Sequence, residues 1–455
     1  MSAVESHDWI ARSGVPLRGA VRVPGDKSVS HRAVMLGALA DGVTSISGFL
    51  EGEDTRATAR ILQQLGVRIE TPAESERIVH GVGLHGLKDA GKALDCGNAG
   101  TGMRLLAGVL AGQPFDSCLI GDASLSGRPM RRVIEPLTAM GARIDAEGDG
   151  LPPLRIHGGR VLHGIDYALP VASAQVKSAL LLAGIYARGE TIVREPHPTR
   201  DYTERMLATF GWPIDFAPGM ARLRGGHRLR ATDIAVPGDF SSAAFLLVAA
   251  SVIRGSELRI EAVGMNPRRV GLLNALRLMG ADIHERNPRM CGGEPVADLI
   301  VHHAPLRGIE VPPALVPDMI DEFPVLFVAA ACASGTTVIR GAAELRVKES
   351  DRIATMTAGL QALGVAIEES PDGALIRGGP IYGGWVDSHG DHRVAMSFAV
   401  AAQLASGDVR IADVANVATS RMFGKFGLLV HTTFSPIHVA PPLRSDCTAV
   451  VTSKL

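Results

Sequence analysis

A chain of 455 residues is too long for one ordinary hydrophobic core, so at least two domains are expected. Apolar residues make up 46% and charged residues 20% of the sequence, a balance typical of a soluble globular protein. The net charge of −1 and the aromatic content of 4% argue against a nucleic-acid-binding protein, which normally shows a basic excess and stacking aromatics.

The cysteines and the apolar segments favour a cytoplasmic protein. The five cysteines include no C-x-x-C pair, which argues against a disulfide framework and against a zinc site. The N-terminus lacks the pattern of a signal peptide, and the most apolar windows are too short to span a bilayer. We therefore expect no membrane segment.

The first predicted unit is a strand, a turn and a helix. The alternating run Val21–Val23 ends at a Pro-Gly-Asp turn, and Lys27 and Ser28 then begin an apolar-periodic helix. Free backbone N–H groups and the helix dipole favour an anion at such a start. Ser28 and Arg32 share a helix face and can bind one anion together, although an ordinary serine cap with solvated cations explains the pattern equally well.

Three polar segments follow in the first half. Asp95–Arg104 is glycine-rich, permits close backbone approach and leads into an apolar helix at Leu105–Ala111, but it matches neither the Walker loop nor the dinucleotide fingerprint. Gly127–Arg132 is predicted to place three arginines on one helical turn, an arrangement that needs water or an anion between them. Ser173–Ser178 predicts a polar helix start, for which a capping serine is the simpler interpretation.

The second half adds acidic and basic groups before apolar helices. Asp321 is predicted near the N-cap of a helix at Val325–Ala333, and a bare cap is the commoner role for such an aspartate. Glu344–Arg352 is the densest charge cluster, which more often marks a solvated face. Gly390–Arg393 adds another arginine before an apolar helix at Val394–Leu404.

The chain repeats one structural unit. An amphipathic segment closes at a glycine and a strand begins, which predicts a C′ glycine at each repeat. Each start carries an arginine about three helical turns before that glycine, so these arginines can converge if the units surround an axis. The copies end at Leu65–Ile69, Met140–Ile144, Phe210–Ile214, Met279–Ile283 and Leu363–Ile367, with a weaker sixth at Phe426–Val430.

A duplication into two three-copy halves is also predicted. Val236–Asp239 echoes Val23–Asp26, and each echo opens a strand, turn and helix, the second helix being Phe240–Val252. A ligand site is expected in a cleft between the halves.

Six motifs together resemble the EPSP synthase (3-phosphoshikimate 1-carboxyvinyltransferase) family, its class II bacterial members in particular. The resemblance runs from about residue 15 to about residue 420. It implies an α/β (α+β) fold, a two-domain inside-out α/β barrel of six βαβαββ units in two pseudo-threefold domains. The implied upper domain is 21–238, and the lower domain is 1–20 with 239–455. The motifs are Pro-Gly-Asp-Lys-Ser (24–28), Gly-Asn-Ala-Gly-Thr (97–101), Arg-Pro-Met (128–130), Ser-Ala-Gln (173–175), Arg-Val-Lys-Glu-Ser-Asp-Arg (346–352) and Asp-His-Arg (391–393).

The resemblance implies transfer of the enolpyruvyl group of phosphoenolpyruvate to the 5-hydroxyl of shikimate 3-phosphate, through a tetrahedral ketal and with release of phosphate. No metal or organic cofactor is implied, and the protein is expected to act as a monomer on small molecules, without nucleic acid or membrane. Arginine suits these anions because its planar fork binds phosphate and carboxylate bidentately. The implied shikimate 3-phosphate ligands are Lys27, Ser28, Arg32, Ser173, Ala174, Gln175, Arg200, Asp321 and Lys348. The implied phosphoenolpyruvate ligands are Lys27, Asn98, Gly100, Arg128, Gln175, Arg352 and Arg393.

Addition followed by elimination requires proton transfer in both directions. By resemblance, Asp321 accepts the proton of the 5-hydroxyl, and Glu349, with Lys27 near, takes part in proton transfer at the methylene carbon of phosphoenolpyruvate. Asp321 is preferred to Asp318 and Glu322 because it keeps the family's spacing to the following helix. Family members insensitive to glyphosate tend to carry a larger residue at the position of Gly100, so the resemblance also predicts sensitivity.

Three other interpretations stay open at this point. A UDP-N-acetylglucosamine enolpyruvyl transferase usually carries a reactive cysteine in a mobile loop; Cys118 is the nearest candidate but lacks the surrounding Arg/Lys loop. An RNA 3′-phosphate cyclase-like protein is disfavoured by the charge and the aromatic content, and a catalytically dead relative by the two acids.

The C-terminal part departs from the family pattern. Thr419-Ser420 is followed by Arg421-Met422 where the family usually continues Phe-Pro, and the tail 432–455 does not resemble the family's end.

Overall fold

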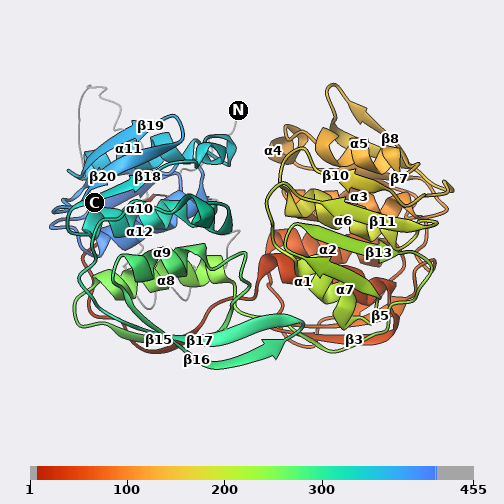
Figure 1. Cartoon of the computed structure of the whole chain (residues 1–455), viewed down its shortest axis with the longest axis horizontal. Helices are drawn as coiled ribbons and strands as arrows, with labels where there is room; N and C mark the ends of the chain where they lie inside the picture. Colours follow the sequence, from red (N-terminus) through yellow and green to blue (C-terminus); the bar gives the residue numbers. More distant parts are fainter. Residues whose placement is uncertain (1–7, 416, 418–455) are drawn as a thin grey trace, which may run out of the picture.

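The computed structural model describes residues 8–415 and residue 417, in two bodies that lie side by side (Figure 1). The core of the first body is formed by buried side chains from Val29 to Val236. The core of the second body combines Ala11, Leu17 and Val23 with side chains from Phe240 onward. The predicted sixth copy at 426–430, the departure at 419–422 and the tail at 432–455 lie outside the described residues.

In the first body, each sheet repeats one topology. An edge strand pairs in parallel with a second strand. The other neighbour of that second strand is antiparallel to it and forms a hairpin with the fourth strand. The three sheets are β14-β3-β5-β4, β6-β7-β9-β8 and β10-β11-β13-β12. The strands are β3 (Asp41–Ser47), β4 (Arg68–Glu70), β5 (Glu76–Val82), β6 (Leu94–Asp95), β7 (Ser117–Ile120), β8 (Arg143–Glu147), β9 (Leu151–His157), β10 (Asp166–Ala168), β11 (Glu190–Arg194), β12 (Ile214–Ala217), β13 (Met220–Arg224) and β14 (Ile234–Ala235).

The second body repeats this plan, but in the described part of the chain two of its three sheets have three strands instead of four. Its sheets are β2-β15-β17-β16, β18-β20-β19 and β1-β22-β21. In the last of these, the N-terminal strand β1 pairs antiparallel with β22, in the position that a hairpin strand takes elsewhere. The strands are β1 (Trp9–Ala11), β2 (Arg18–Arg22), β15 (Glu257–Gly264), β16 (Asp282–Cys291), β17 (Glu294–His302), β18 (Thr336–Ile339), β19 (Ala366–Ser370), β20 (Gly373–Arg377), β21 (Gly384–Asp387) and β22 (Val409–Ala412).

Apolar helices fill the centre of each body, and amphipathic helices accompany the sheets. Helices that are apolar on nearly every side must be buried, and this agrees with their sequences. The central helices are α1 (Lys27–Leu39), α3 (Gly100–Ala111) and α6 (Ala174–Gly184) in the first body, and α8 (Phe240–Val252), α10 (Phe323–Cys332) and α12 (His392–Ala402) in the second. The other α-helices are α2 (Glu53–Gln64), α4 (Ala123–Ser126), α5 (Arg131–Ala139), α7 (Tyr202–Thr209), α9 (Gly271–Leu278) and α11 (Arg352–Ala362). In the described ranges, no helix is long and apolar enough to cross a membrane.

The repeat glycines confirm the predicted helix ends. All five have positive φ, the conformation that a C′ glycine adopts most readily. Their φ angles are 91° at Gly66, 102° at Gly141, 79° at Gly211, 94° at Gly280 and 85° at Gly364.

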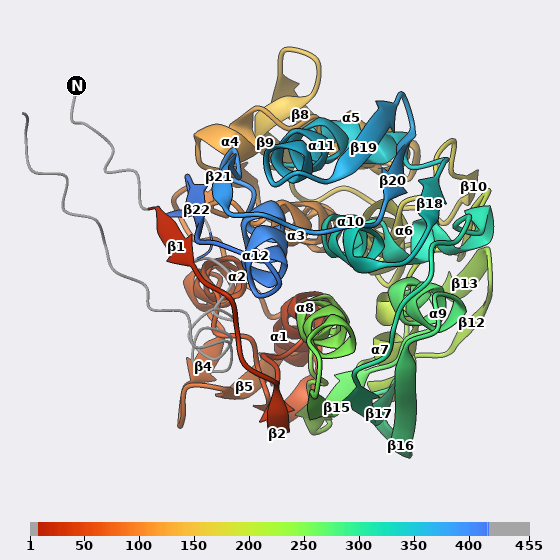
Figure 2. The same cartoon turned by 90° about the vertical axis from the view of Figure 1, so that its left-hand side faces the viewer.

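The two echoed turns pair with each other at the junction of the bodies. The Asp26 N–H donates to Pro237 O at 2.8 Å, and the Asp239 N–H donates to Pro24 O at 2.9 Å. Asp26 caps α1 by accepting from the N–H of Val29, and Asp239 likewise caps α8. Their pairing therefore fixes the starts of two buried helices beside each other, one in each body (Figure 2).

The structure corrects the prediction for Gly127–Arg132. Gly127 is the C-cap of α4 and α5 begins only at Arg131, so Arg128 does not share a helical turn with the next two arginines. Arg131 is neutralised by an ion pair with Glu135 at 2.7 Å. Arg128 is thereby separated from Arg131 and Arg132, and its guanidinium binds Asn98 and Ser124 instead.

A glycine substitution tests the repeat geometry. Gly280→Ala is expected to lower the free energy of unfolding by about 1–2 kcal/mol, because an L-residue is strained at positive φ. The strain is conformational, since a Cβ at Gly280 would lie 3.8 Å from its nearest neighbour, Pro305 O. Gly379→Ala is the control, with open space and no positive φ. Equal losses in urea unfolding of the two variants would contradict the interpretation.

Candidate active site

The start of α1 carries the first group of charged side chains. Lys27 forms an ion pair with Asp54, which lies in the first turn of α2. Burial opposes the charge on Asp54, but the Lys27 ammonium more than compensates, so the pKa of Asp54 is lowered. Arg128 also lowers this pKa, which places its charge in the same group.

The glycine-rich segment brings Arg128 beside Asn98. Arg128 Nη2 donates to Asn98 Oδ1 at 2.8 Å and to Ser124 Oγ at 3.0 Å. A Cβ at Gly100 would lie 3.4 Å from Arg128 Nη1 and 3.1 Å from Arg104 Nη1. Helix α3 begins at Gly100 rather than at the predicted Leu105, so the glycine presents the helix N-terminus between two guanidinium groups.

Gln175 joins this group from α6. Arg104 Nη1 donates to Gln175 Oε1 at 2.8 Å, and Gln175 Nε2 donates to Thr101 Oγ1 at 2.9 Å. Burial and the nearby arginines lower the pKa of Arg104 to about 10. Ser173 caps α6 by accepting from the N–H of Val176, as the simpler interpretation predicted, and Ala174 is the first residue of the helix.

Arg32 lies beneath the start of α1, bound to protein groups. Its Nη1 donates to the backbone oxygen of Ser28 at 2.8 Å. Its other nitrogens donate to Thr203 Oγ1 at 2.7 Å and Ser178 Oγ at 2.8 Å. Burial lowers the pKa of Arg32 to about 10. In this arrangement Arg32 supports the first turn of α1 from inside.

In the second body, cations surround Asp321. It lies one residue before Glu322, the N-cap of α10, and so near the N-cap as predicted, although it does not itself cap the helix. Arg393 Nη1 donates to the backbone oxygen of Asp321 at 3.2 Å. Burial opposes the charge, but the cations, Arg393 foremost, hold the pKa of Asp321 well below its usual value. The cationic nitrogens near its carboxylate oxygens belong to Arg269 (3.3 Å), Arg200 (3.7 Å), Arg352 (3.8 Å) and Lys348 (4.0 Å).

Two carboxylates hold Arg352 in place. Its Nε donates to Asp391 Oδ2 and its Nη2 to Glu349 Oε2, both at 2.7 Å. The side chain is only 1% exposed, and its buried Nη1 has no hydrogen-bond partner among the described residues. Burial opposes the charge on Glu349, but Arg352 lowers its pKa, so this carboxylate is ionised. Arg352 therefore directs one unused donor toward Asp321, a suitable contact for an anionic ligand.

Arg200 connects the two bodies. It precedes α7 of the first body, and its Nη1 reaches Asp321 Oδ2 of the second. A second contact between the bodies lies nearby, where Asn266 Nδ2 of the second body donates to Asp201 Oδ1 of the first at 2.7 Å. The described structure thus brings the predicted site residues together in two groups, one on each body, with Arg200 between them. Within the described ranges, Lys27 and Arg128 form no hydrogen bond or ion pair with the second body.

Sequence reasoning did not select Asp54, Arg104, Arg269 and Asp391 as site residues. Asp54 and Arg269 lie at the repeated helix starts, and the other two lie within the motifs already singled out. Aligning the repeats on Arg200 and Arg352 would have pointed to Arg269, because all three arginines now face Asp321.

Comparisons with known proteins agree on one family. The family model for EPSP synthase (3-phosphoshikimate 1-carboxyvinyltransferase) matches residues 11–426. A 3-phosphoshikimate 1-carboxyvinyltransferase of Xanthomonas oryzae pv. oryzae is 70% identical over 415 residues, 91% of this chain and 94% of the relative. One of Xanthomonas campestris pv. campestris is 70% identical over 412 residues, covering 90% and 94%. The solved EPSP synthase of Acinetobacter baumannii superposes with a TM-score of 0.89 at 49% identity, covering 94% of this chain and 99% of that one.

A charge substitution tests the support of Arg352. Asp391→Asn keeps an oxygen that can cap α12 but leaves the buried guanidinium without its main counter-charge. It is expected to lower the free energy of unfolding by about 3 kcal/mol. Asp408→Asn, in an exposed pair with Arg12, should change it by less than about 1 kcal/mol. Similar losses in urea unfolding would contradict the assigned role.

Proposed function

The chain belongs to the EPSP synthase family, and we propose that the charged groups around Asp321, Lys27 and Arg128 perform that family's reaction. The protein is a transferase that moves the enolpyruvyl group of phosphoenolpyruvate to the 5-hydroxyl of shikimate 3-phosphate, with release of phosphate. The observation that carries the proposal for the site is the ring of cations around one carboxylate at the junction of two bodies.

Shikimate 3-phosphate binds across the junction in this proposal. The start of α6 offers backbone N–H groups and Ser173, and Arg200 supplies a cation that already reaches the second body. Lys348 is the corresponding cation from the second body, 4.0 Å from Asp321. The full set of proposed ligands is Lys27, Ser28, Arg32, Ser173, Ala174, Gln175, Arg200, Asp321 and Lys348. Arg32 would join it by releasing one of its present partners, Thr203 or Ser178.

Phosphoenolpyruvate binds between two guanidinium groups of opposite bodies. Arg128 lies beside the N-terminus of α3, and Arg352 offers its unused Nη1 from the other side. Such planar donors match both the carboxylate and the phosphate of this substrate. The full set of ligands is Lys27, Asn98, Gly100, Arg128, Gln175, Arg352 and Arg393.

Asp321 and Glu349 move the protons. Both carboxylates are ionised because cations lower their pKa values, so both can accept a proton. Bound phosphate and carboxylate groups neutralise the cations around Asp321, which raises its pKa toward the range where it accepts the hydroxyl proton well. In the addition the methylene carbon gains a proton, which the Lys27 ammonium supplies as it approaches from the other body. In the elimination the ionised Glu349 takes a proton from that carbon as phosphate leaves.

Closure of the two bodies completes the site. They act as two domains, 21–238 and 1–20 with 239–455. Because β2 and Val23 pack with the second body, the chain first passes from the second body to the first at the turn 24–27 and not at residue 21. Closure would bring Lys27 and Arg128 to the Asp321 group and exclude water from the ketal. The enzyme acts as a cytoplasmic monomer. The comparisons favour neither the UDP-N-acetylglucosamine transferase nor the cyclase.

Asp321→Asn tests the proposed base. With folding verified by circular dichroism, kcat for phosphate release from shikimate 3-phosphate and phosphoenolpyruvate should fall about 10²–10⁴-fold. Asp318→Asn is the matched control, because Asp318 lies three residues earlier and pairs with Arg268 at 3.2 Å. Its kcat should stay within the same order of magnitude. An equal loss in the control would remove Asp321 from its assigned role.

Gly100→Ala tests the phosphoenolpyruvate site. The protein should be inhibited by glyphosate in competition with phosphoenolpyruvate. The added methyl, 3.1 Å from Arg104 Nη1, crowds the two guanidinium groups, so the variant should need several-fold more glyphosate for half inhibition. The control variant Gly379→Ala should need the same glyphosate concentration for half inhibition as the wild type. Inhibition of the wild type without such competition would refute the assignment.

A further inference from the structure

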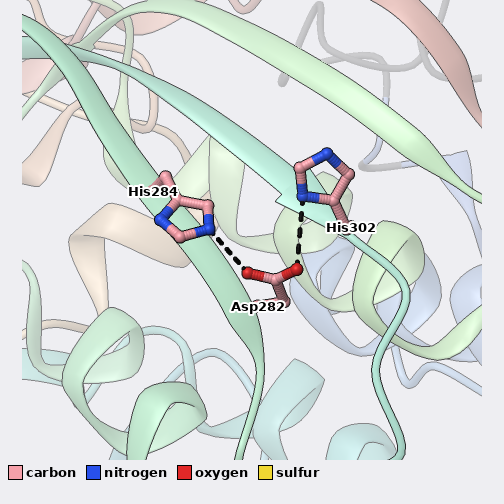
Figure 3. Close-up of side chains that lie close together, drawn as sticks. All are labelled: Asp282, His284 and His302. Carbon is pink, nitrogen blue, oxygen red and sulfur yellow. Dashed lines mark ion pairs between the residues drawn. The ribbon is translucent and has the colours of Figure 1, made fainter.

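A cluster of metal-binding side chains lies on the second body, outside the site described above. Asp282 and His284 belong to β16, and His302 ends the neighbouring strand β17 (Figure 3). Asp282 is the direct cross-strand partner of His302, whose partner on its other side is Glu257 of β15. Because residues two apart on a strand face the same way, all four side chains share one face of the sheet.

The ligand atoms of three of these side chains converge. His284 Nε2 is 2.7 Å from Asp282 Oδ1, and His302 Nδ1 is 3.4 Å from Asp282 Oδ2, as Figure 3 shows. All the ligand atoms lie within 4.8 Å of one another. A zinc ion with ligand distances of about 2.0–2.2 Å needs its ligand atoms somewhat more than 3 Å apart. Small rotations of these partly exposed side chains are enough to reach that spacing.

His302 has features that a surface ion pair does not require. Among the described residues its buried Nδ1 has no hydrogen-bond partner, although the side chain as a whole is 37% exposed. Its other nitrogen, Nε2, faces Glu257 Oε1 at 3.9 Å. At 3.9 Å this is not yet a hydrogen bond, but a rotation of the exposed Glu257 side chain would bring its carboxylate behind the ring, where such a group orients a metal-bound histidine. A simple Asp–His pair would need only one of the two histidines.

We propose that Asp282, His284 and His302 form a binding site for a divalent transition-metal cation of the zinc class, with Glu257 orienting His302. Two imidazoles and one carboxylate favour zinc, nickel or copper over calcium or magnesium, which prefer oxygen ligands. Water completes the coordination on the exposed side. The ion would clip β16 to β17 at the base of their hairpin.

That hairpin reaches the first body at its other end. In Figure 1 the β16–β17 hairpin extends beneath the first body, and near its tip Glu294 Oε2 accepts from Asn266 Nδ2, which also donates to Asp201 of the first body. The metal would therefore stiffen an element that touches both bodies without entering the reaction.

Calorimetric titration of the full chain with ZnCl₂ tests the proposal. One saturable site per chain is expected, and His284→Ala and His302→Ala should each weaken its affinity at least tenfold. His157→Ala is the matched control: His157 also lies between two carboxylates of a sheet, Asp145 at 2.6 Å and Asp116 at 3.6 Å, but no second imidazole joins it in the cluster. It should bind zinc like the wild type.

Two further measurements keep the result interpretable. All three variants should retain wild-type phosphate release from the two substrates, which verifies folding. Co²⁺ added in place of zinc should give a visible absorption spectrum that the His284→Ala and His302→Ala variants lose. No saturable binding to the wild type, or unchanged affinity in both of these variants, would overturn the proposal.

Discussion

The structure depends on holding many cations close together in a largely buried place. Arginines and lysines that converge repel one another, and burial removes the solvent that would screen them. Asp321 offsets this repulsion at the junction, because its carboxylate lies within 4.0 Å of four cationic groups from three separate segments. Asp391 and Glu349 do the same for Arg352.

Repetition of one α/β unit explains how the cations reach the same place. Each unit presents a helix start at an equivalent position, and free N–H groups and the dipole already favour anions there. Arg200, Arg269 and Arg352 come from three such starts and all face Asp321. A repeated unit therefore brings several arginines to one place through the same local structure.

Hydrogen bonds and ion pairs join the two bodies where the chain crosses and around Arg200 and Asn266. The paired turns at Asp26 and Asp239 tie the starts of α1 and α8 together through backbone hydrogen bonds. Lys27 and Arg128, in contrast, contact only their own body among the described residues. The proposed closure would bring these two cations to the Asp321 group while the paired turns stay in place.

The sequence by itself determined the features that depend on local spacing. The motifs identified the family and the implied site residues, and the repeat glycines marked helix ends because positive φ is a local requirement. Phe240–Val252 was predicted with its observed bounds, since an apolar run between an aspartate cap and a strand leaves little choice.

Only the tertiary structure decided which distant groups meet. The pairing of Lys27 with Asp54, the burial of Arg32 beneath Ser28 and the strand that β1 adds to the last sheet all depend on long-range packing and register. The same holds for Asp282 and His302, which are neighbours only because β16 and β17 pair in one register. Sequence spacing fixes what a turn or a helix does, but contact between separate elements is set by how their apolar faces pack.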